Sequence, residues 1–225
     1  MDKLQFSKAL ADIGLVLTDA QLDQFSTFEE NLYAANEVMN LTRVPREECW
    51  LRHFLDSVLF QDLIPNGATV LDIGSGPGLP SWPLACARPD LQVTALDSGG
   101  KMIGFLQRNP LPNLEPILGR AEDWKVTNRF EVVTGRALAP FGIQMELSVP
   151  PCKIDGMVIP MRTPSDEKAV REFDAELLGV SLEKVETRTL PGTDIVRLFP
   201  VFRKLKKTDA QYPRSWSEIK RQPLF

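Results

Sequence analysis

Cysteine and histidine are scarce in this chain of 225 residues, which contains three cysteines and one histidine. Cys49, Cys86 and Cys152 are odd in number and widely spaced, and no CxxC pair occurs. The sequence therefore argues against a disulfide framework and against a zinc site, and we expect no bound metal. Unpaired cysteines of this kind are typical of reduced thiols, so we expect a cytoplasmic protein.

Long apolar runs are also missing. No run is long enough to span a bilayer, and the first residues lack the cationic-then-apolar pattern of a secretion signal, so we expect no membrane partner. We find no internal repeat and no low-complexity segment. A hydrophobic content of 43% is ordinary for a protein with a real core. The length allows one domain with additions, or two small domains.

Positive charge is in the minority, and its distribution is uneven. The net charge of −4 argues mildly against bulk nucleic-acid binding. Residues 203–225, however, carry seven cations and two carboxylates, so this segment is +5 and the remainder −9. Tyr212 and Trp216 are interleaved with the cations, which suits phosphate contacts and base stacking. The alternative is a solvated terminal segment, or one that packs back on the sheet through Trp216 and Leu224.

The chain divides into a helical first third and an alternating remainder. Thr18 and Gln21 fit a capping box, and apolar residues from Leu22 onward follow at helical spacing. Beyond Gly67, we predict strands at 68–73, 91–97, 114–118, 130–135, 154–161, 180–189 and 194–202. Helices are predicted at 80–88, 99–108, 141–148 and 165–178. We therefore expect a helical cap at 1–66, a core at 67–202 and a basic tail at 203–225.

The last two predicted strands are joined by Pro191 and Gly192, which is too short a connection for a crossover helix. They should therefore pair antiparallel. Alternating strands and helices that end in a hairpin predict an α/β fold: a doubly wound, Rossmann-like sheet with an antiparallel C-terminal strand.

One strand runs directly into three alternating glycines, Gly74, Gly76 and Gly78. Glycine tolerates positive φ and lets a ligand approach the backbone. The next predicted strand ends at Asp97, whose carboxylate can accept hydrogen bonds from both hydroxyls of a ribose. Together these residues predict a nucleoside-binding crevice at the carboxyl ends of parallel strands.

The glycine spacing selects the nucleoside. A dinucleotide fingerprint is G-x-G-x-x-G, whereas here the sixth position is Leu79 and Pro80 follows it. A helix start obstructed in this way is a poor pyrophosphate cradle. S-adenosylmethionine has a ribose but no phosphate, so we predict it as the cofactor. A dinucleotide, or a loop without a ligand, is the alternative.

Two polar groups in the cap have both a structural and a functional interpretation. Asn40 and Arg43 follow the second helix, and they form either a helix stop or a loop over the crevice. His53, Asp56 and Ser57 lie three and four residues apart on one helix. A catalytic triad is disfavoured, because a serine nucleophile needs a strained, exposed turn. A polar helix face is the simpler interpretation, and a wall of the substrate site is the other.

Two further groups follow predicted strands. Ala121 and Glu122 come after the third strand, beside the expected adenine, although a helix N-terminus also favours acidic residues. Arg136 follows the fourth strand, at the rim where ligands bind in such sheets.

In order and spacing, these motifs resemble the RsmG (GidB-type) family of 16S ribosomal RNA guanine-N7 methyltransferases. The matching segments are 40–43, 52–57, 71–80, 96–101, 120–122 and 135–137, and the likeness resumes at 212–214 and 223–224. The resemblance implies methyl transfer from S-adenosylmethionine to N7 of a guanine, with 16S rRNA or the small ribosomal subunit as partner. N7 carries no proton, so no general base is expected.

The resemblance and the glycine loop give two sets of candidate residues. Substrate-site candidates are Asn40, Arg43, His53 and Arg136. The predicted cofactor-binding residues are Asp72, Gly74, Gly76, Gly78, Leu79, Asp97, Ala121, Glu122 and Arg136.

The chain departs from the family pattern at Met102 and Gly104, where the family has arginines, and at Pro160–Arg162, where it tends to have Leu-Lys-Gly. These changes remove cations near the expected RNA side. Two alternatives therefore stay open: a methyltransferase of the same fold with another substrate, and a silent module that binds RNA or the ribosome. Intact glycines and Asp97 argue against the second.

Overall fold

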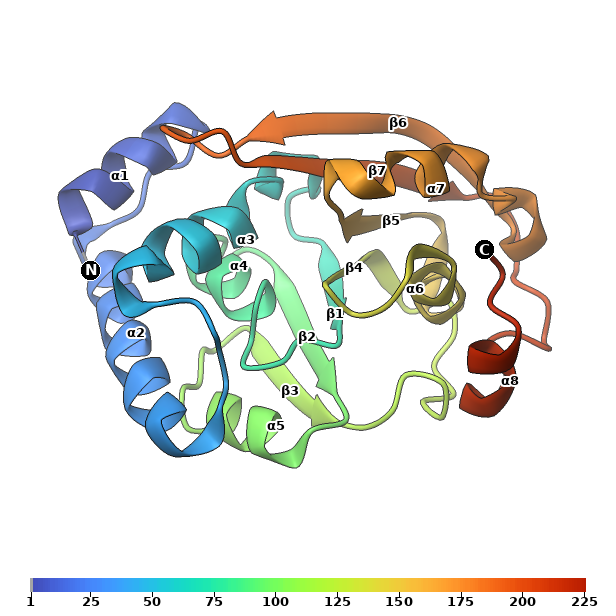
Figure 1. The fold of residues 1–225 in the computed structure, drawn as a ribbon, viewed down its shortest axis with the longest axis horizontal. Helices are drawn as coiled ribbons and strands as arrows, with labels where there is room; N and C mark the ends of the chain where they lie inside the picture. The colour runs from blue at the N-terminus through green and yellow to red at the C-terminus, as the bar shows by residue number, and fades with distance from the viewer. Residues whose placement is uncertain (1) are drawn as a thin grey trace.

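A seven-stranded mixed sheet forms the centre of the computed structural model, which describes residues 2–225 (Figure 1). The strand order is β3-β2-β1-β4-β5-β7-β6. Strands β1 to β5 are parallel, and β7 is antiparallel to both of its neighbours. The predicted sheet with one antiparallel strand is confirmed. The bounds are β1 (Thr69–Ile73), β2 (Gln92–Asp97), β3 (Leu114–Leu118), β4 (Phe130–Arg136), β5 (Cys152–Met161), β6 (Val180–Thr189) and β7 (Val196–Lys204).

Helices cover both faces of the sheet, because successive strand residues point alternately into two apolar cores. On one face, Val70 and Val93 pack with the cap and with helices α4 (Ser81–Ala87) and α5 (Gly100–Gln107). On the other face, Leu71 and Leu96 pack with α6 (Phe141–Ser148) and α7 (Glu167–Glu172). The carboxyl ends of the parallel strands are left for a ligand.

The helix predicted over 165–178 is wrong in its extent. The segment contains a 3-10 turn at Pro164–Asp166, the short helix α7 and a second 3-10 turn at Ala175–Leu178. Phe173 leaves the helical conformation, with φ −65° and ψ 126°. Its side chain then packs edge-on against Phe141 and Phe202. Burial of this ring in the second core outweighs helix continuation.

The cap consists of α1 (Lys3–Asp12), α2 (Asp19–Met39), a 3-10 turn at Arg46–Glu48, a π-helical segment at Trp50–Leu55, α3 (Asp56–Val58) and a 3-10 turn at Gln61–Leu63. The predicted capping box of Thr18 and Gln21 is present at the start of α2. Phe28 of α2 stacks on Trp82 of α4, with ring centroids 4.0 Å apart. This contact fixes the cap against the helix that follows the glycine loop.

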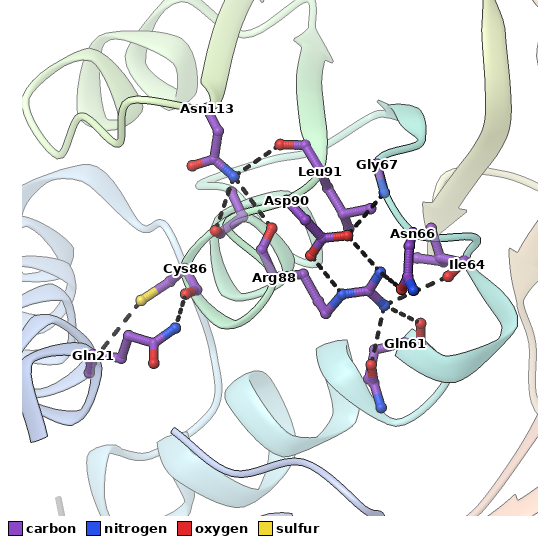
Figure 2. A network of polar contacts seen from close by, with 11 residues as sticks. Gln21, Gln61, Ile64, Asn66, Gly67, Cys86, Arg88, Asp90, Leu91 and Asn113 are labelled. Atoms are coloured by element: carbon purple, nitrogen blue, oxygen red, sulfur yellow. Dashed lines mark hydrogen bonds and ion pairs between the residues drawn. The ribbon is translucent and has the colours of Figure 1, made fainter. Parts of the chain in front are cut away.

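A polar network at the amino ends of the strands also joins cap and core (Figure 2). Arg88, which follows α4, donates to Asp90 and to the carbonyl and side-chain oxygens of Gln61. Its second Nη donates to Asn66, and Gln21 of α2 donates to the Cys86 carbonyl at 2.7 Å. The network lies at the amino ends of the strands, whereas the glycine loop lies at their carboxyl ends. It therefore stabilises the cap without occupying the candidate site.

The basic segment 203–225 is more buried than its charge suggests. Arg203 and Lys204 are the last residues of β7, so the strand continues beyond the expected boundary at 202. Lys204 is fully buried, and its Nζ donates to the carbonyls of Val149, Pro150 and Cys152 at 2.8–3.2 Å. Arg203 pairs with Glu183. Two of the seven cations therefore serve the fold.

The end of the chain packs on the sheet's second face. Helix α8 (Trp216–Arg221) lies beside α6 (Figure 1). Arg214 pairs with the fully buried Glu146 of α6, and Ile219 is fully buried. The packing alternative that names Trp216 and Leu224 agrees with these contacts, since both side chains pack against core clusters.

Within residues 2–225, no helix is both long and apolar enough to cross a bilayer. The same part of the chain contains no group of three or more His, Cys, Asp or Glu side chains arranged to hold a metal ion.

Candidate functional site

The site lies where the carboxyl ends of β1, β2 and β4 meet. A first cavity of about 210 Å³ opens here, and its lining combines apolar residues with the carboxylates of Asp97 and Glu122. Its lining residues are Ile73, Gly74, Leu96, Asp97, Ser98, Gly119, Arg120, Ala121, Glu122, Leu138, Leu147 and Trp216. The sequence predicted four of them as cofactor residues: Gly74, Asp97, Ala121 and Glu122.

The glycine loop after β1 is held by the neighbouring strand. The backbone N–H groups of Gly74 and Ser75 donate to the Leu96 carbonyl at 2.8 and 3.2 Å. Gly76 has φ +55°, and a Cβ placed there would meet no atom within 4 Å, so this position leaves open space for a ligand. A Cβ on Gly78 would lie 2.4 Å from Leu106 Cδ2, so that glycine serves close helix packing.

Asp97 is fixed by two backbone donors. Gly76 N–H donates to Oδ2 at 2.8 Å, and Gly99 N–H donates to Oδ1 at 2.7 Å. Each carboxylate oxygen has two lone pairs, so one acceptor position on each stays available. The carboxylate therefore suits paired ribose hydroxyls, as predicted from its place after the second strand.

Asp72 of β1 lies behind the loop and is fully buried. Its Oδ2 accepts from the Ser81 backbone N–H at 3.0 Å, while Oδ1 has no hydrogen-bond partner among residues 2–225. Burial raises the pKa of Asp72 to about 7. A buried carboxylate oxygen without a donor fits a ligand that carries a cationic amino group, such as the methionine part of S-adenosylmethionine.

The other five predicted cofactor residues lie outside the first cavity's lining: Asp72, Gly76, Gly78, Leu79 and Arg136, the last of which lines a second cavity. Leu79 is buried, and its N–H donates to the Ser75 carbonyl at 2.9 Å. Gly78 and Leu79 therefore shape the loop, and neither residue lines either cavity.

A second, larger cavity of about 480 Å³ opens at the same edge. It is rich in arginine, and the residues around it come from the cap, β4, β5 and β7. They are Val44, Arg52, His53, Asp56, Arg136, Ala137, Ala139, Met161, Arg162, Thr163, Asp166 and Arg197. The segment 137–139 separates the two cavities, since Leu138 lines the first while Ala137 and Ala139 line the second.

Asp56 organises this second cavity. It is buried, and its carboxylate accepts from Arg197 Nε at 2.8 Å, from Arg197 Nη2 at 3.1 Å and from Arg136 Nη1 at 3.3 Å. His53, Asp56 and Ser57 form a polar helix face that is buried rather than exposed to solvent. The two arginines compensate the buried charge of Asp56.

His53 bridges the cap loop and Arg136. Its Nδ1 lies 3.4 Å from Arg136 Nη2 and its Nε2 lies 2.6 Å from Thr42 Oγ1. A guanidinium can only donate, so Nδ1 accepts and the neutral ring carries its proton on Nε2. Burial, followed by the charge of Arg136, lowers the pKa of His53 to about 3.

The triad interpretation fails on geometry. The partners of His53 are Thr42 and Arg136, and Ser57 Oγ is buried with no hydrogen-bond partner in the described chain.

The structure brings His53 and Arg136 together but leaves the other two substrate candidates apart. Asn40 ends α2 in the left-handed conformation, which is the helix-stop interpretation. Arg43 is exposed in the same loop. Neither residue lines either of these two cavities, whereas their neighbour Val44 lines the second one.

Arg197, Arg162 and Trp216 are among the lining residues that sequence reasoning did not place in the site. Arg197 lies near the start of β7. Because β7 is antiparallel, its start lies at the carboxyl edge of the parallel strands, and the predicted hairpin contained that signal. Arg162 was noted only as a departure from a family pattern. Trp216 was assigned to RNA stacking or to packing.

The comparisons with known proteins agree with this geometry. Residues 21–195 match the family model GidB, described as rRNA small subunit methyltransferase G. A protein of Lactobacillus helveticus named ribosomal RNA small subunit methyltransferase G is 37% identical over the whole of both chains. One of the same name from Lacticaseibacillus paracasei is 38% identical over 100% of this chain and 99% of that one.

Solved structures show the same fold at low identity. The AdoMet complex of M. jannaschii TYW2 has a TM-score of 0.51 at 20% identity, covering 63% of this chain and 72% of that one. A TehB-like SAM-dependent methyltransferase of Corynebacterium glutamicum has a TM-score of 0.52 at 19% identity, covering 83% and 100%. With the family match over most of its length, the chain belongs to the GidB family, rRNA small subunit methyltransferase G.

Proposed function

We propose that this methyltransferase transfers a methyl group from S-adenosylmethionine to N7 of a guanine in 16S rRNA. Family membership supports the rRNA substrate. The observation that carries the proposal is the pair of cavities at one sheet edge: a glycine- and carboxylate-lined cavity beside an arginine-lined one, with the segment 137–139 between them. A cofactor in the first and a nucleotide in the second would meet along that segment.

The first cavity is the proposed cofactor site. Asp97 would accept from the ribose hydroxyls, and Asp72 would compensate the charge of the amino group. Ala121 and Glu122 would read the adenine edge, through a backbone N–H and a carboxylate. The glycine loop would let the ligand lie against the backbone at Gly76. Bound S-adenosylmethionine supplies an electrophilic methyl group on a sulfonium.

The proposed reaction requires no proton transfer by a side chain of this protein. Guanine N7 has an in-plane lone pair and no proton, so attack requires no general base. His53 is a poor base, because its pKa is about 3 and its Nδ1 already accepts from Arg136. The catalytic contribution is then positioning of N7 in line with the methyl group.

The second cavity is the proposed nucleotide pocket. Its four arginines exceed its two carboxylates, Asp56 and Asp166, so the net charge of the lining suits a phosphate. Arg136 and Arg197 are held by Asp56 and present a fixed cationic wall. The target guanine has to be splayed out of RNA structure to enter. Arg43, exposed on the neighbouring loop, would meet the RNA outside the pocket.

We assign the three parts of the chain distinct roles. The cap at 1–66 supplies His53, Asp56 and the loop with Arg43, the core at 67–202 holds the cofactor, and the tail at 203–225 is the remaining candidate RNA contact. The proposed partner is 16S rRNA or the small ribosomal subunit, and a partner of this kind supports a cytoplasmic location for the activity.

Transfer of a labelled methyl group from S-adenosylmethionine tests the proposal. The substrates are unmodified 16S rRNA, small subunits, 23S rRNA and total protein. We expect label in 16S rRNA or small subunits alone. Asp97→Ala should abolish transfer, because it removes two hydrogen bonds to a charged acceptor, worth roughly 2–4 kcal/mol together. Lys8→Gln, which changes an exposed residue of α1 that lines neither cavity, is the matched control.

Label in protein would favour another substrate for the same fold. RNA binding with neither cofactor binding nor transfer would favour a silent ribosome-binding module. Either result contradicts the proposed reaction.

A further inference from the structure

The cofactor cavity has one wall that does not come from the alternating core. Trp216, the first residue of α8, lines the cavity together with Asp97, Ala121 and Glu122. Its indole is half-buried and packs with the cluster that includes Ala121 and Leu138. Asp97, Ala121 and Glu122 in the same lining are the residues proposed to hold the adenosine.

The position of Trp216 is fixed by a buried anchor just before it in the chain. The fully buried Glu146 carboxylate accepts from the Arg214 backbone N–H at 2.9 Å, from Nε at 2.9 Å and from Nη2 at 2.6 Å. Arg214 Nη2 also donates to the Gln222 carbonyl at 3.0 Å, which closes the segment on itself. Glu146 is next to Leu147, another lining residue of the same cavity.

Helix α8 has its own restraints on the indole. Ser215 and Glu218 form a capping box at its start. Ile219 is fully buried against Ile143 and Leu147 of α6. Lys220 Nζ lies 5.8 Å from the centroid of the Trp216 ring. A short helix held at its cap, its apolar face and its preceding arginine presents the indole as a fixed surface.

An indole is a suitable partner for a purine, because every base has a flat π face and stacking on an aromatic ring needs no hydrogen-bond pattern. The other lining side chains near Ala121 are aliphatic or charged, and Trp216 is the one aromatic ring among the cavity's lining residues. The half-buried ring keeps part of its surface available in the absence of ligand.

We propose that Trp216 is a wall of the adenine subsite, so that segment 212–225 is part of the cofactor site and holds the adenosine only while it is docked on Glu146. This inference rests on the proposed cofactor site in the first cavity. It assigns the family-like C-terminal residues Tyr212–Arg214 a specific purpose here: they anchor the helix that carries the indole.

Calorimetric titration with S-adenosylmethionine and with S-adenosylhomocysteine tests this assignment. Trp216→Ala should weaken both ligands about ten-fold or more, the range found for removal of one base-stacking ring. The affinity for both ligands should fall by the same factor, because both ligands contain the adenosine. Trp216→Phe should recover most of the loss. Lys8→Gln changes an exposed residue of α1 outside the cavity and should bind like the parent.

Tryptophan emission gives a readout that a purely structural role would not move. Ligand should change the emission of the parent, and Trp216→Phe should lose that change while Trp50→Phe, in the cap, keeps it. If Trp216→Ala does not fold, the emission of Trp216→Phe decides the matter: a ligand response equal to the parent's overturns the proposal.

Asp97→Ala separates failure of this inference from failure of the site. Loss of binding in Asp97→Ala with parent-like affinity in folded Trp216→Ala contradicts the role of Trp216 alone. Parent-like affinity in Asp97→Ala contradicts the cofactor site itself.

Discussion

Asp56 and Asp72 are both buried carboxylates, yet their surroundings give them different roles. Asp56 is held by two arginines, whereas one oxygen of Asp72 has no donor among the described residues. The first is therefore a fixed organiser of cationic side chains, whereas the second keeps one acceptor oxygen without a described donor. Sequence alone placed both residues in motifs but did not distinguish them, because neither arginine partner is near them in the chain.

The pKa of Asp72 predicts a pH dependence of cofactor binding. In the free protein, Asp72 is neutral below about pH 7 and ionised above it. A cationic amino group favours the ionised form, so affinity for S-adenosylmethionine should rise as pH increases to about 7 and then level off. One pH unit below that point, affinity should be about ten-fold weaker.

Titrations between pH 5.5 and 7.5 measure this dependence. Asp72→Asn should bind more weakly at neutral pH and lose the dependence. An affinity that is constant across this range in the parent would contradict the role of Asp72.

His53 should contribute to positioning rather than to proton transfer. His53→Gln should lower turnover modestly and leave S-adenosylmethionine affinity nearly unchanged, because the ring lines the nucleotide pocket and holds Arg136. The free-enzyme pH profile should show no essential group near pH 6.5, the ordinary pKa of histidine. Complete loss of activity in His53→Gln with normal RNA binding would instead indicate an acid–base role.

The same buried histidine predicts acid sensitivity of the fold. Its folded pKa of about 3 lies below the unfolded value near 6.5. The stabilisation from keeping it neutral is present above pH 6.5 and is lost as pH falls from there toward 3. In thermal melts over this range, His53→Gln should lose less stability than the parent, and equal losses would argue against a neutral buried ring.

At the scale of elements, the strands, the turns and the glycine-loop part of the site were predictable. The residues that β7 and α8 contribute to the cavities were not. The glycine loop, Asp97 and the hairpin follow from short patterns, since apolar runs, glycine spacing and a tight Pro191–Gly192 turn are local signals. Arg197 reaches the site through the reversed direction of β7, and Trp216 reaches it through a helix docked on Glu146. The direction of β7 follows from the predicted hairpin, whereas the pairing of Arg197 with Asp56 and the docking of α8 are tertiary contacts that no local pattern predicts.

The tail shows the limit of counting charges. Lys204 and Arg214, both counted as candidate phosphate contacts, have internal partners. Lys206 and Lys207 are exposed. Of these four cations, only Lys206 and Lys207 are therefore available to contact RNA.

The element-scale prediction separates the two pairs. Replacing Lys206 and Lys207 by Gln should weaken RNA binding and flatten its salt dependence, by about 0.7 in slope per lost single-strand contact. The fold and cofactor affinity should be unchanged. Lys204→Gln should instead destabilise the protein by about 2–4 kcal/mol, because three buried carbonyls lose a charged donor. Salt titrations and chemical denaturation measure the two effects, and an unchanged salt slope in the double variant would leave RNA binding to the cap and the pocket rim.

The whole molecule brings a cofactor cavity and an arginine-lined cavity to one edge of a doubly wound sheet. The topology was predictable because alternating strands and helices allow few arrangements. The second cavity was not, because it forms between the cap, β4, β5 and β7, which are far apart in the sequence. The cap's position depends on contacts such as Phe28 with Trp82, which only the folded chain brings together.

Chemical identification of the modified atom tests the central claim most directly. 16S rRNA is isolated from cells with and without this protein, and N7-methylguanine is located by borohydride reduction and aniline cleavage, with mass spectrometry of the nucleosides. We predict one cleavage site that is present with the protein, absent without it and restored by the parent but not by Asp97→Ala. Identical N7-methylguanine patterns in the two RNAs would contradict the account.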